Sequence, residues 1–176
     1  MSTHRETVDG RWLRAVVVVA IVLASSSGAA ETTASLCTAK EQTLFRCKTG
    51  RKIISVCATP ELSADRGSVQ YRFGRPDAPE LVHPPAADWR SVTHGGVLTF
   101  AGGGGAYLAF TKGPYRYVVY TAIGRGWGEK AGVTVEKDGK RIATLPCNGK
   151  ETSELGPDLF ATAGIGEDSA GFDLPD

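Results

Sequence analysis

Four cysteines constrain this chain more than any other feature of its sequence: Cys37, Cys47, Cys57 and Cys147. Zinc binding is one use of such a set, but the spacings contain no CxxC pair and no histidine lies near them. An even number of cysteines behind an export signal is typical of a disulfide framework. We therefore predict two disulfides, provided that the chain is exported.

The first 30 residues have the order of regions found in a secretory signal peptide. Three arginines make the start basic, residues 15–24 form an unbroken apolar run, and residues 25–30 are small. An uncleaved membrane anchor is the alternative, but a helix that spans a bilayer needs roughly twenty apolar residues. We predict cleavage after Ala30 and a mature protein that is periplasmic or secreted.

The predicted mature chain carries no net charge. Of the 20 basic and 19 acidic residues, three basic and two acidic ones lie in the first 30, which leaves 17 of each. General affinity for nucleic acid or for an anionic membrane requires a basic surplus. We therefore expect no nucleic-acid partner and no membrane association of the mature form. The length that remains suits one domain with a hydrophobic core.

Short alternating segments separated by glycine-rich turns indicate β-strands. In Ser68–Phe73 every second residue is apolar or aromatic, the pattern of a half-buried strand. Asp138-Gly139 is a strong hairpin signal. Seven or eight strands predict an all-β fold, a single small antiparallel sandwich or barrel. The predicted strands are 43–48, 52–57, 68–73, 97–100, 106–111, 115–122, 132–136 and 140–145.

The remaining segments are assigned by composition. Residues 59–67 and the proline-rich 76–87 are predicted as loops. A short helix is expected within 153–163, with Ser153 or Pro157 near its start. Residues 164–176 are acidic without a basic residue, which predicts a flexible acidic tail behind a β domain of residues 31–163.

The first predicted hairpin limits how the cysteines can pair. With a turn near Gly50, Cys57 lies opposite residue 42 or 43, roughly 13–16 Å along the strand from Cys47. A disulfide requires Cα atoms within about 7 Å, which excludes Cys47–Cys57. Two pairings remain. We favour Cys37–Cys57 with Cys47–Cys147 over Cys37–Cys47 with Cys57–Cys147, because Cys37 can fold back across the end of the hairpin.

No residue pattern indicates catalysis or metal binding. His83 and His94 are the only histidines of the predicted mature chain, and no GxSxG nucleophile turn accompanies them. We interpret both as loop histidines without function, and we expect no cofactor and no metal. The carboxylates that could serve a glycosidase lie among lysines, as solvated residues do: Glu129, Glu136, Glu151 and Glu154.

Two glycine-rich segments are the candidate binding loops. The run Gly102–Gly105 leads into a strand rather than a helix, which argues against a nucleotide loop. A loop without side chains can enter a narrow cleft, and a flexible hairpin loop or bulged edge is the alternative. In Ile123–Gly132 an arginine and a tryptophan stand between glycines, and these types often anchor interfaces. Alternatively, the tryptophan closes the core. The candidate binding residues are Gly103, Gly104, Gly105, Tyr107, Arg125 and Trp127.

Two families resemble this sequence. The runs Phe45-Arg46-Cys47, Ser55-Val56-Cys57 and Gln70-Tyr71-Arg72-Phe73-Gly74 resemble a group of uncharacterised exported proteobacterial proteins. That likeness implies export and a β fold. Gly104-Gly105-Ala106-Tyr107 resembles, more loosely, the Ser-Gly-x-x-Tyr loop that periplasmic lysozyme inhibitors insert into the enzyme's cleft. This second likeness implies a small disulfide-bonded β protein that inhibits a cell-wall lytic enzyme.

Three functions remain open at the level of the sequence. The favoured one is a non-enzymatic binding protein of the bacterial envelope whose ligand is a protein or an envelope polymer. The second is a structural or stress-related envelope protein without a discrete site. The third is an enzyme whose site has no recognisable motif.

Overall fold

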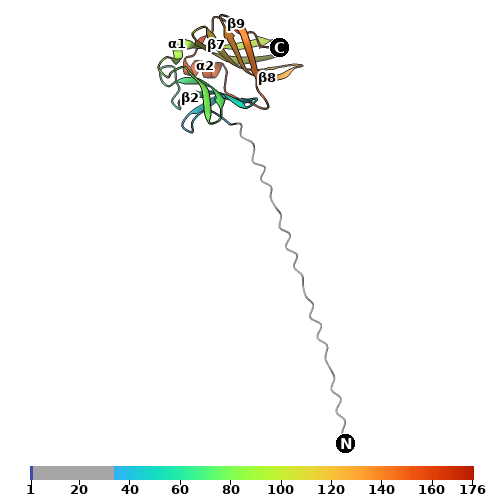
Figure 1. Ribbon diagram of the computed structural model, residues 1–176. Coiled ribbons are helices and arrows are strands. Elements are labelled where there is room, and N and C mark those ends of the chain that lie inside the picture. The colour runs from blue at the N-terminus through green and yellow to red at the C-terminus, as the bar shows by residue number, and fades with distance from the viewer. Residues whose placement is uncertain (2–33) are drawn as a thin grey trace. The chain divides into compact units, whose positions relative to one another are not determined.

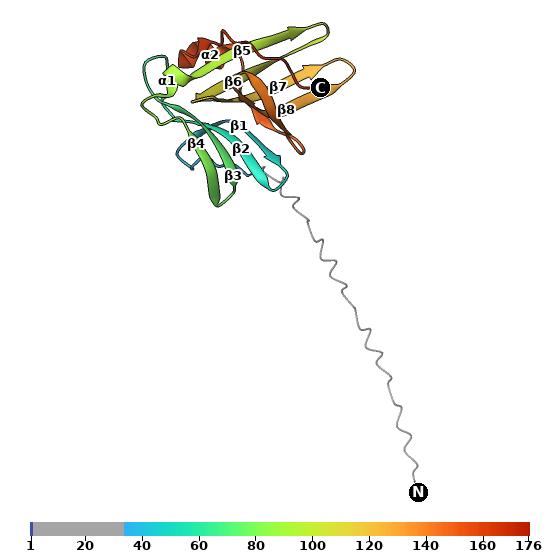
Figure 2. The same cartoon turned by 45° about the horizontal axis from the view of Figure 1, so that its top comes forward.

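The computed structural model describes Met1 and residues 34–176, so that the predicted signal peptide and its cleavage site after Ala30 lie outside the described residues. Two sheets form the layers of a sandwich, and they do not close into a barrel. Figure 2 shows the layers, with β1–β4 in one and β5–β8 in the other. The mostly β, two-disulfide fold predicted from the sequence is confirmed.

The first sheet has five antiparallel strands in the spatial order β10, β1, β2, β3, β4. A turn at Gly50 and Arg51 joins β1 to β2, and Gly50 has a φ of 58°, as a tight hairpin turn requires. The strands are β1 (Gln42–Thr49), β2 (Lys52–Ala58), β3 (Val69–Arg75), β4 (Ala78–His83) and β10 (Thr152–Ser153).

The second sheet has six strands in the order β11, β5, β6, β7, β8, β9. Neighbouring strands are antiparallel, except that β11 runs parallel to β5. Figure 1 shows β7, β8 and β9 of this sheet and the short helix α2. The strands are β5 (Thr93–Phe100), β6 (Gly103–Lys112), β7 (Tyr115–Gly124), β8 (Gly128–Lys137), β9 (Lys140–Pro146) and β11 (Gly166–Glu167).

The main core lies between the two sheets. Tyr71 of β3 is its largest fully buried side chain, and its ring stacks on Phe110 at 5.7 Å and on Tyr117 at 5.5 Å between ring centroids. Residues of β1, β2, β6, β7 and β8 contribute to this core, together with Trp89, Phe160 and Ala163 from the two short helical segments 89–92 and 157–163. Along β6 alternate residues face opposite ways: Leu108 enters the main core, whereas Tyr107 lies in a smaller cluster on the outer face of the second sheet.

Both favoured disulfides are confirmed. Cys57 pairs with Thr43 across the β1–β2 hairpin, as the hairpin argument requires, and it bonds to Cys37. Cys47 bonds to Cys147, with Cα atoms 5.6 Å apart. The backbone N–H of Cys147 donates to the carbonyl of Ala131 in β8, so the second disulfide joins the two sheets. Two disulfides are typical of proteins that fold in an oxidising, exported compartment.

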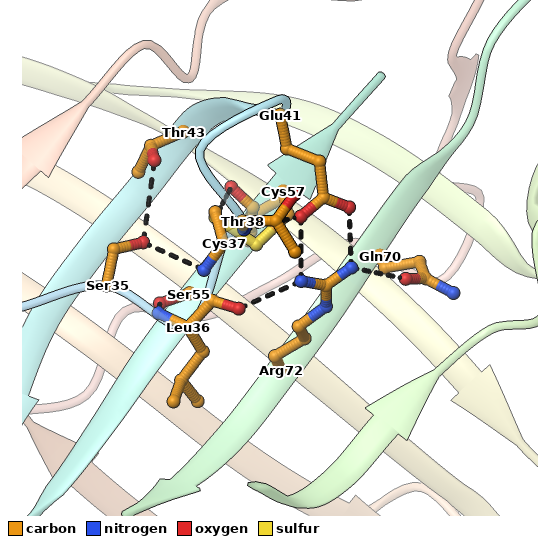
Figure 3. Close-up of a disulfide and its surroundings, with 11 residues drawn as sticks. Ser35, Leu36, Cys37, Thr38, Glu41, Thr43, Ser55, Cys57, Gln70 and Arg72 are labelled. Atoms are coloured by element: carbon orange, nitrogen blue, oxygen red, sulfur yellow. Dashed lines mark hydrogen bonds and ion pairs between the residues drawn. A yellow bond between two sulfur atoms is a disulfide. The ribbon is translucent and has the colours of Figure 1, made fainter. Parts of the chain in front are cut away.

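Residues 34–41, which precede β1, lie on the outer face of the five-stranded sheet (Figure 3). The Cys37–Cys57 disulfide fixes this segment to β2. The backbone N–H of Leu36 donates to Ser55 Oγ at 3.0 Å, and the Leu36 side chain is buried. The disulfide therefore anchors an added layer and does not cross the core.

An ion pair also holds this segment to the five-stranded sheet. Both terminal nitrogens of Arg72 donate to the carboxylate of Glu41, at 2.8 and 2.6 Å, and Arg72 also donates to the Leu36 carbonyl (Figure 3). Partial burial alone would raise the pKa of Glu41. The hydrogen bonds from Arg72 and from Thr38 outweigh this effect, and the pKa of Glu41 lies below its ordinary value.

The prediction of a loop over 76–87 is wrong, because β4 (Ala78–His83) lies within it. The strand carries Pro79, which has no N–H to donate to a sheet. This is tolerated because β4 is the edge strand of its sheet. Beyond it the short helix α1 (Trp89–Val92) buries Trp89. Residues 59–67 form a loop, as predicted.

The predicted helix within 153–163 is confirmed as α2 (Pro157–Ala163). Pro157 occupies its first turn, and Gly164 ends it with a φ of 63°. The acidic composition of 164–176 predicts a flexible tail, whereas in the structure this segment makes contacts along its length. It forms β11 and then places Phe172 against Tyr107 and Tyr120. The acidic composition did not indicate this contact because it depends on one apolar residue, Phe172, among the acidic ones.

Candidate functional site

Two hairpins meet at one end of the six-stranded sheet. The β5–β6 turn lies at Ala101 and Gly102, and the β7–β8 turn at residues 125–127. The backbone N–H of Arg125 donates to the carbonyl of Gly102 at 3.0 Å. We call the ends of these hairpins, residues 97–104 and 123–130, the hairpin tip. In Figure 2 it extends away from β1–β4.

Three of the four glycines of the run Gly102–Gly105 lie in a strand, contrary to the sequence-based interpretation of the run as a loop, and only Gly102 lies in the turn. Gly103, Gly104 and Gly105 belong to β6 and pair with β5 on one side and β7 on the other. A Cβ atom on Gly103 would lie 2.1 Å from the Ile123 carbonyl oxygen, and one on Gly105 would lie 2.3 Å from that of Thr121. Gly103 and Gly105 therefore allow a close approach of β7. Because the run is hydrogen-bonded to strands on both sides, it cannot enter a cleft as a separate loop.

The prediction that Ile123–Gly132 is a loop is also wrong over most of its length. The strands β7 and β8 extend to Gly124 and from Gly128, so that only residues 125–127 form the turn. Repeated glycines concealed these strands because glycine has low β-propensity.

The outer side of the hairpin tip carries an aromatic pair. The Trp127 ring lies over Gly124, where a Cβ atom would be 2.1 Å from the ring. The Trp127 ring centroid is 5.5 Å from that of Phe100 and 5.3 Å from the Lys130 ammonium nitrogen. Trp127 remains 39% exposed, and Arg125 is exposed beside it. Trp127 therefore does not close the main core.

The inner side of the hairpin tip is a shallow apolar surface. Ile123 is 58% exposed and Val97 is 54% exposed, and both lie on the strand face that enters the main core further along. Ile123 and Gly104 line a depression of about 270 Å³ that also includes Glu129 and Leu155. Because Gly104 has no side chain, backbone forms part of its floor.

Tyr107 does not belong to this site. It is 3% exposed, and its ring packs against Phe172 at 5.1 Å between centroids. Burial and the neighbouring Asp168 carboxylate, which also bonds to its hydroxyl, raise the pKa of Tyr107 to about 12. The structure thus brings four of the six predicted binding residues into the hairpin tip: Gly103, Gly104, Arg125 and Trp127. Gly105 follows the tip in β6, and Tyr107 lies beneath the C-terminal segment.

The histidines lie in strands and not in loops. His83 ends β4, is 8% exposed, and its Nε2 lies 2.8 Å from the Thr111 carbonyl oxygen. His94 lies in β5, next to the parallel strand β11. Within residues 34–176 no group of histidine, cysteine and acidic residues could hold a metal ion. In the same range no helix is long and apolar enough to cross a membrane.

A charged cluster on the outer face was not found from the sequence. Arg116 of β7 pairs with Glu136 at 2.5 Å and with Asp168, and all three side chains are largely buried. Burial alone would lower the pKa of Arg116, but the bonds to Glu136 and Asp168 raise it. Glu136 is therefore a paired residue and not a solvated one. Strand register places Arg116 opposite Glu136, and the segment after β11 brings Asp168 to them, which sequence spacing could not show.

The hairpin tip joins an exposed tryptophan, an exposed arginine and exposed aliphatic side chains on a paired, rigid support, which is an arrangement suited to binding. Comparisons with protein-family models, with curated proteins and with solved structures find no match to this chain.

Proposed function

We propose that this protein is exported by a cleavable signal peptide, residues 1–30, and acts in the periplasm or outside the cell as a non-enzymatic binding protein. Its partner is another protein, which it binds through the hairpin tip. The basic, apolar and small regions of the N-terminus support export. The two disulfides support an oxidising destination.

The concentration of exposed apolar side chains at the hairpin tip carries this proposal. Of the five large apolar side chains exposed within residues 34–176, three lie there: Val97, Ile123 and Trp127. Tryptophan and arginine are the types most enriched among residues that dominate binding energy. Because both hairpins are paired to each other, little backbone entropy is lost when a partner binds.

Inhibition of a cell-wall lytic enzyme is the most concrete form of this function. A narrow, rigid projection with an aromatic side chain is suited to a substrate cleft, and lytic enzymes share the proposed compartment. The contact differs from the one that the likeness to lysozyme inhibitors implies. Tyr107 is buried, so Trp127 and Ile123 take the place that the likeness gave to Tyr107.

The test is inhibition of c-, g- and i-type lysozymes by the oxidised protein, comparing Ile123→Asp with Ile142→Asp. The two isoleucines are 58% and 57% exposed, and Ile142 lies on β9, away from the hairpin tip. We expect Ile123→Asp and Trp127→Ala to weaken inhibition by roughly 30-fold, the effect of losing a residue worth about 2 kcal/mol, and Ile142→Asp to leave it unchanged.

Each other result has a definite meaning. Equal inhibition by the Ile123 and Ile142 variants would place the contact outside the hairpin tip. No inhibition of any lysozyme class at micromolar concentration would discard the inhibitory form, and a structural envelope protein without a discrete site would then be favoured.

A further inference from the structure

The segment after β11 lies across the outer face of the six-stranded sheet. We call residues 168–176 the C-terminal strap. It begins where the backbone N–H of Asp168 donates to the Gly95 carbonyl of β5 at 2.9 Å. Its far end lies beside β7 and β8 in Figures 1 and 2. The strap therefore crosses the strands of the sheet.

Basic side chains of three strands hold alternate carbonyl groups of the strap. Arg116 of β7 donates to the carbonyl of residue 171 at 2.7 Å, and Lys130 of β8 donates to that of residue 175 at 2.9 Å. Arg141 of β9 donates to the carbonyl of residue 173 between them. Because these bonds recognise main-chain atoms at a period of two, they fit an extended peptide whatever its side chains.

The side chains between these carbonyls supply the specificity. The Phe172 ring lies 5.1 Å from that of Tyr107 and 5.5 Å from that of Tyr120, with the Arg141 guanidinium 6.0 Å from its centroid. Leu174 packs on the same cluster. The pattern that fits is one large aromatic residue followed two positions later by an aliphatic one.

An acidic residue completes the pattern. The carboxylate of Asp168, four residues before Phe172, pairs with Arg116 and is 8% exposed. A neutral residue there would leave one side of a largely buried guanidinium without its partner. Arg116, Lys130 and Arg141 thus form a basic surface that matches an acidic extended segment.

The strap is separable from the rest of the fold. The outer-face cluster that it covers, built on Tyr107 and Tyr120, is distinct from the main core between the sheets. Only two residue pairs join β11 to β5. Release of the strap therefore exposes one aromatic surface and leaves the main core closed.

We propose that the outer face of the six-stranded sheet is a peptide-binding site for an acidic, phenylalanine-bearing extended segment, and that a second copy of this chain supplies that segment in trans. The segment that the face holds has the identical sequence in a second copy, so every contact can be repeated between two chains. Exchange of an element between protomers is a low-cost route to a dimer. Lys130 belongs to the hairpin tip as well as to this site, but Arg116, Arg141, Tyr107 and Tyr120 lie outside the tip, and the inference does not require the tip to bind a partner.

The first arm tests the site itself in the full-length chain. We expect Phe172→Ala to weaken the chain's own strap, and a labelled peptide of residues 166–176 then to bind the variant with micromolar affinity. The unchanged chain binds the peptide at least about tenfold more weakly, because its own strap competes at an effective concentration of millimolar order. The same peptide with alanine at the phenylalanine position is the matched control.

If the peptide fails to bind a folded Phe172→Ala chain, or if the control peptide binds equally well, the outer face of the six-stranded sheet is not a site for this peptide. The milder variant Leu174→Ala serves the same purpose if Phe172→Ala does not fold.

The second arm tests the source of the segment. A Phe172→Ala chain, with an intact site, is mixed with an Arg141→Glu chain, whose site is damaged and whose strap is intact. We expect a 1:1 complex by light scattering in the mixture, and at most a tenth as much dimer in either variant alone. If the peptide binds but this complex does not form, a second copy of the chain is not the source of the bound segment.

Discussion

At the scale of single residues, adjacent glycines of β6 meet different surroundings. A Cβ atom on Gly105 would lie 2.3 Å from the Thr121 carbonyl oxygen, whereas one on Gly104 would have Leu98 O as its nearest atom, at 3.1 Å. Neither glycine has a positive φ, so backbone strain plays no part. Gly105 is required by the approach of β7, and Gly104 is required much less.

The pair Gly105→Ala and Gly104→Ala tests this difference. We expect Gly105→Ala to lower the free energy of unfolding by about 2 kcal/mol or more, the cost of an overpacked position. Gly104→Ala should change it by less than about 1 kcal/mol, since the smaller clash is offset by reduced freedom of the unfolded chain. Urea unfolding of both variants measures the difference, and equal costs would contradict the role given to β7.

At the scale of elements, the sequence predicted strands best where side chains alternate. The segment Ser68–Phe73 is found within β3 apart from its first residue, and the hairpin around Gly50 has the predicted register, with Cys57 opposite Thr43. Strands made of glycine or carrying proline were missed or shortened, as with β4 and the start of β6. Their pairing depends on neighbours far along the chain, and local propensity does not contain that information.

The candidate site was only partly predictable, for the same reason. Arg125 and Trp127 were found because those residue types in a glycine-rich segment favour an exposed turn. Ile123 and Val97 were not found, because their exposure depends on how far the five-stranded sheet covers the other sheet. Tyr107 was misplaced because the residue that buries it, Phe172, lies in a segment whose charge suggested a tail.

The strap should control the ionisation of Tyr107. Burial and Asp168 raise the pKa of this phenol from 10.0 to about 12. The folded value lies above the unfolded one, so the stabilisation is complete below pH 10 and is lost as the pH rises from 10 through about 12. In Phe172→Ala we expect the pKa of Tyr107 to fall towards 10.

Site-resolved carbon NMR of labelled tyrosines across this pH range measures the shift. Tyr71, whose pKa is raised by burial in the main core, is the internal control and should not change. An unchanged Tyr107 in a folded Phe172→Ala chain would mean that the strap is not what buries the phenol.

At the scale of the whole molecule, the two disulfides have different tasks. Cys37–Cys57 joins residues 20 apart and fastens a surface segment, whereas Cys47–Cys147 joins residues 100 apart and links the two sheets. A disulfide stabilises mainly by restricting the unfolded chain, and the effect grows with the length of the enclosed loop. The long-range bond is therefore the main covalent constraint on the sandwich.

Removing each disulfide by paired cysteine-to-alanine substitution tests this assignment. We expect the loss of Cys47–Cys147 to lower the free energy of unfolding by about 5 kcal/mol and the loss of Cys37–Cys57 by about 3 kcal/mol. Urea unfolding at low temperature measures both, with thiol titration to show that the other bond is intact. Equal losses would contradict the loop-length argument and would mean that the two bonds act mainly through the native state. In the native state the Cys37–Cys57 disulfide also holds Glu41 near Arg72, so its loss would weaken that ion pair as well.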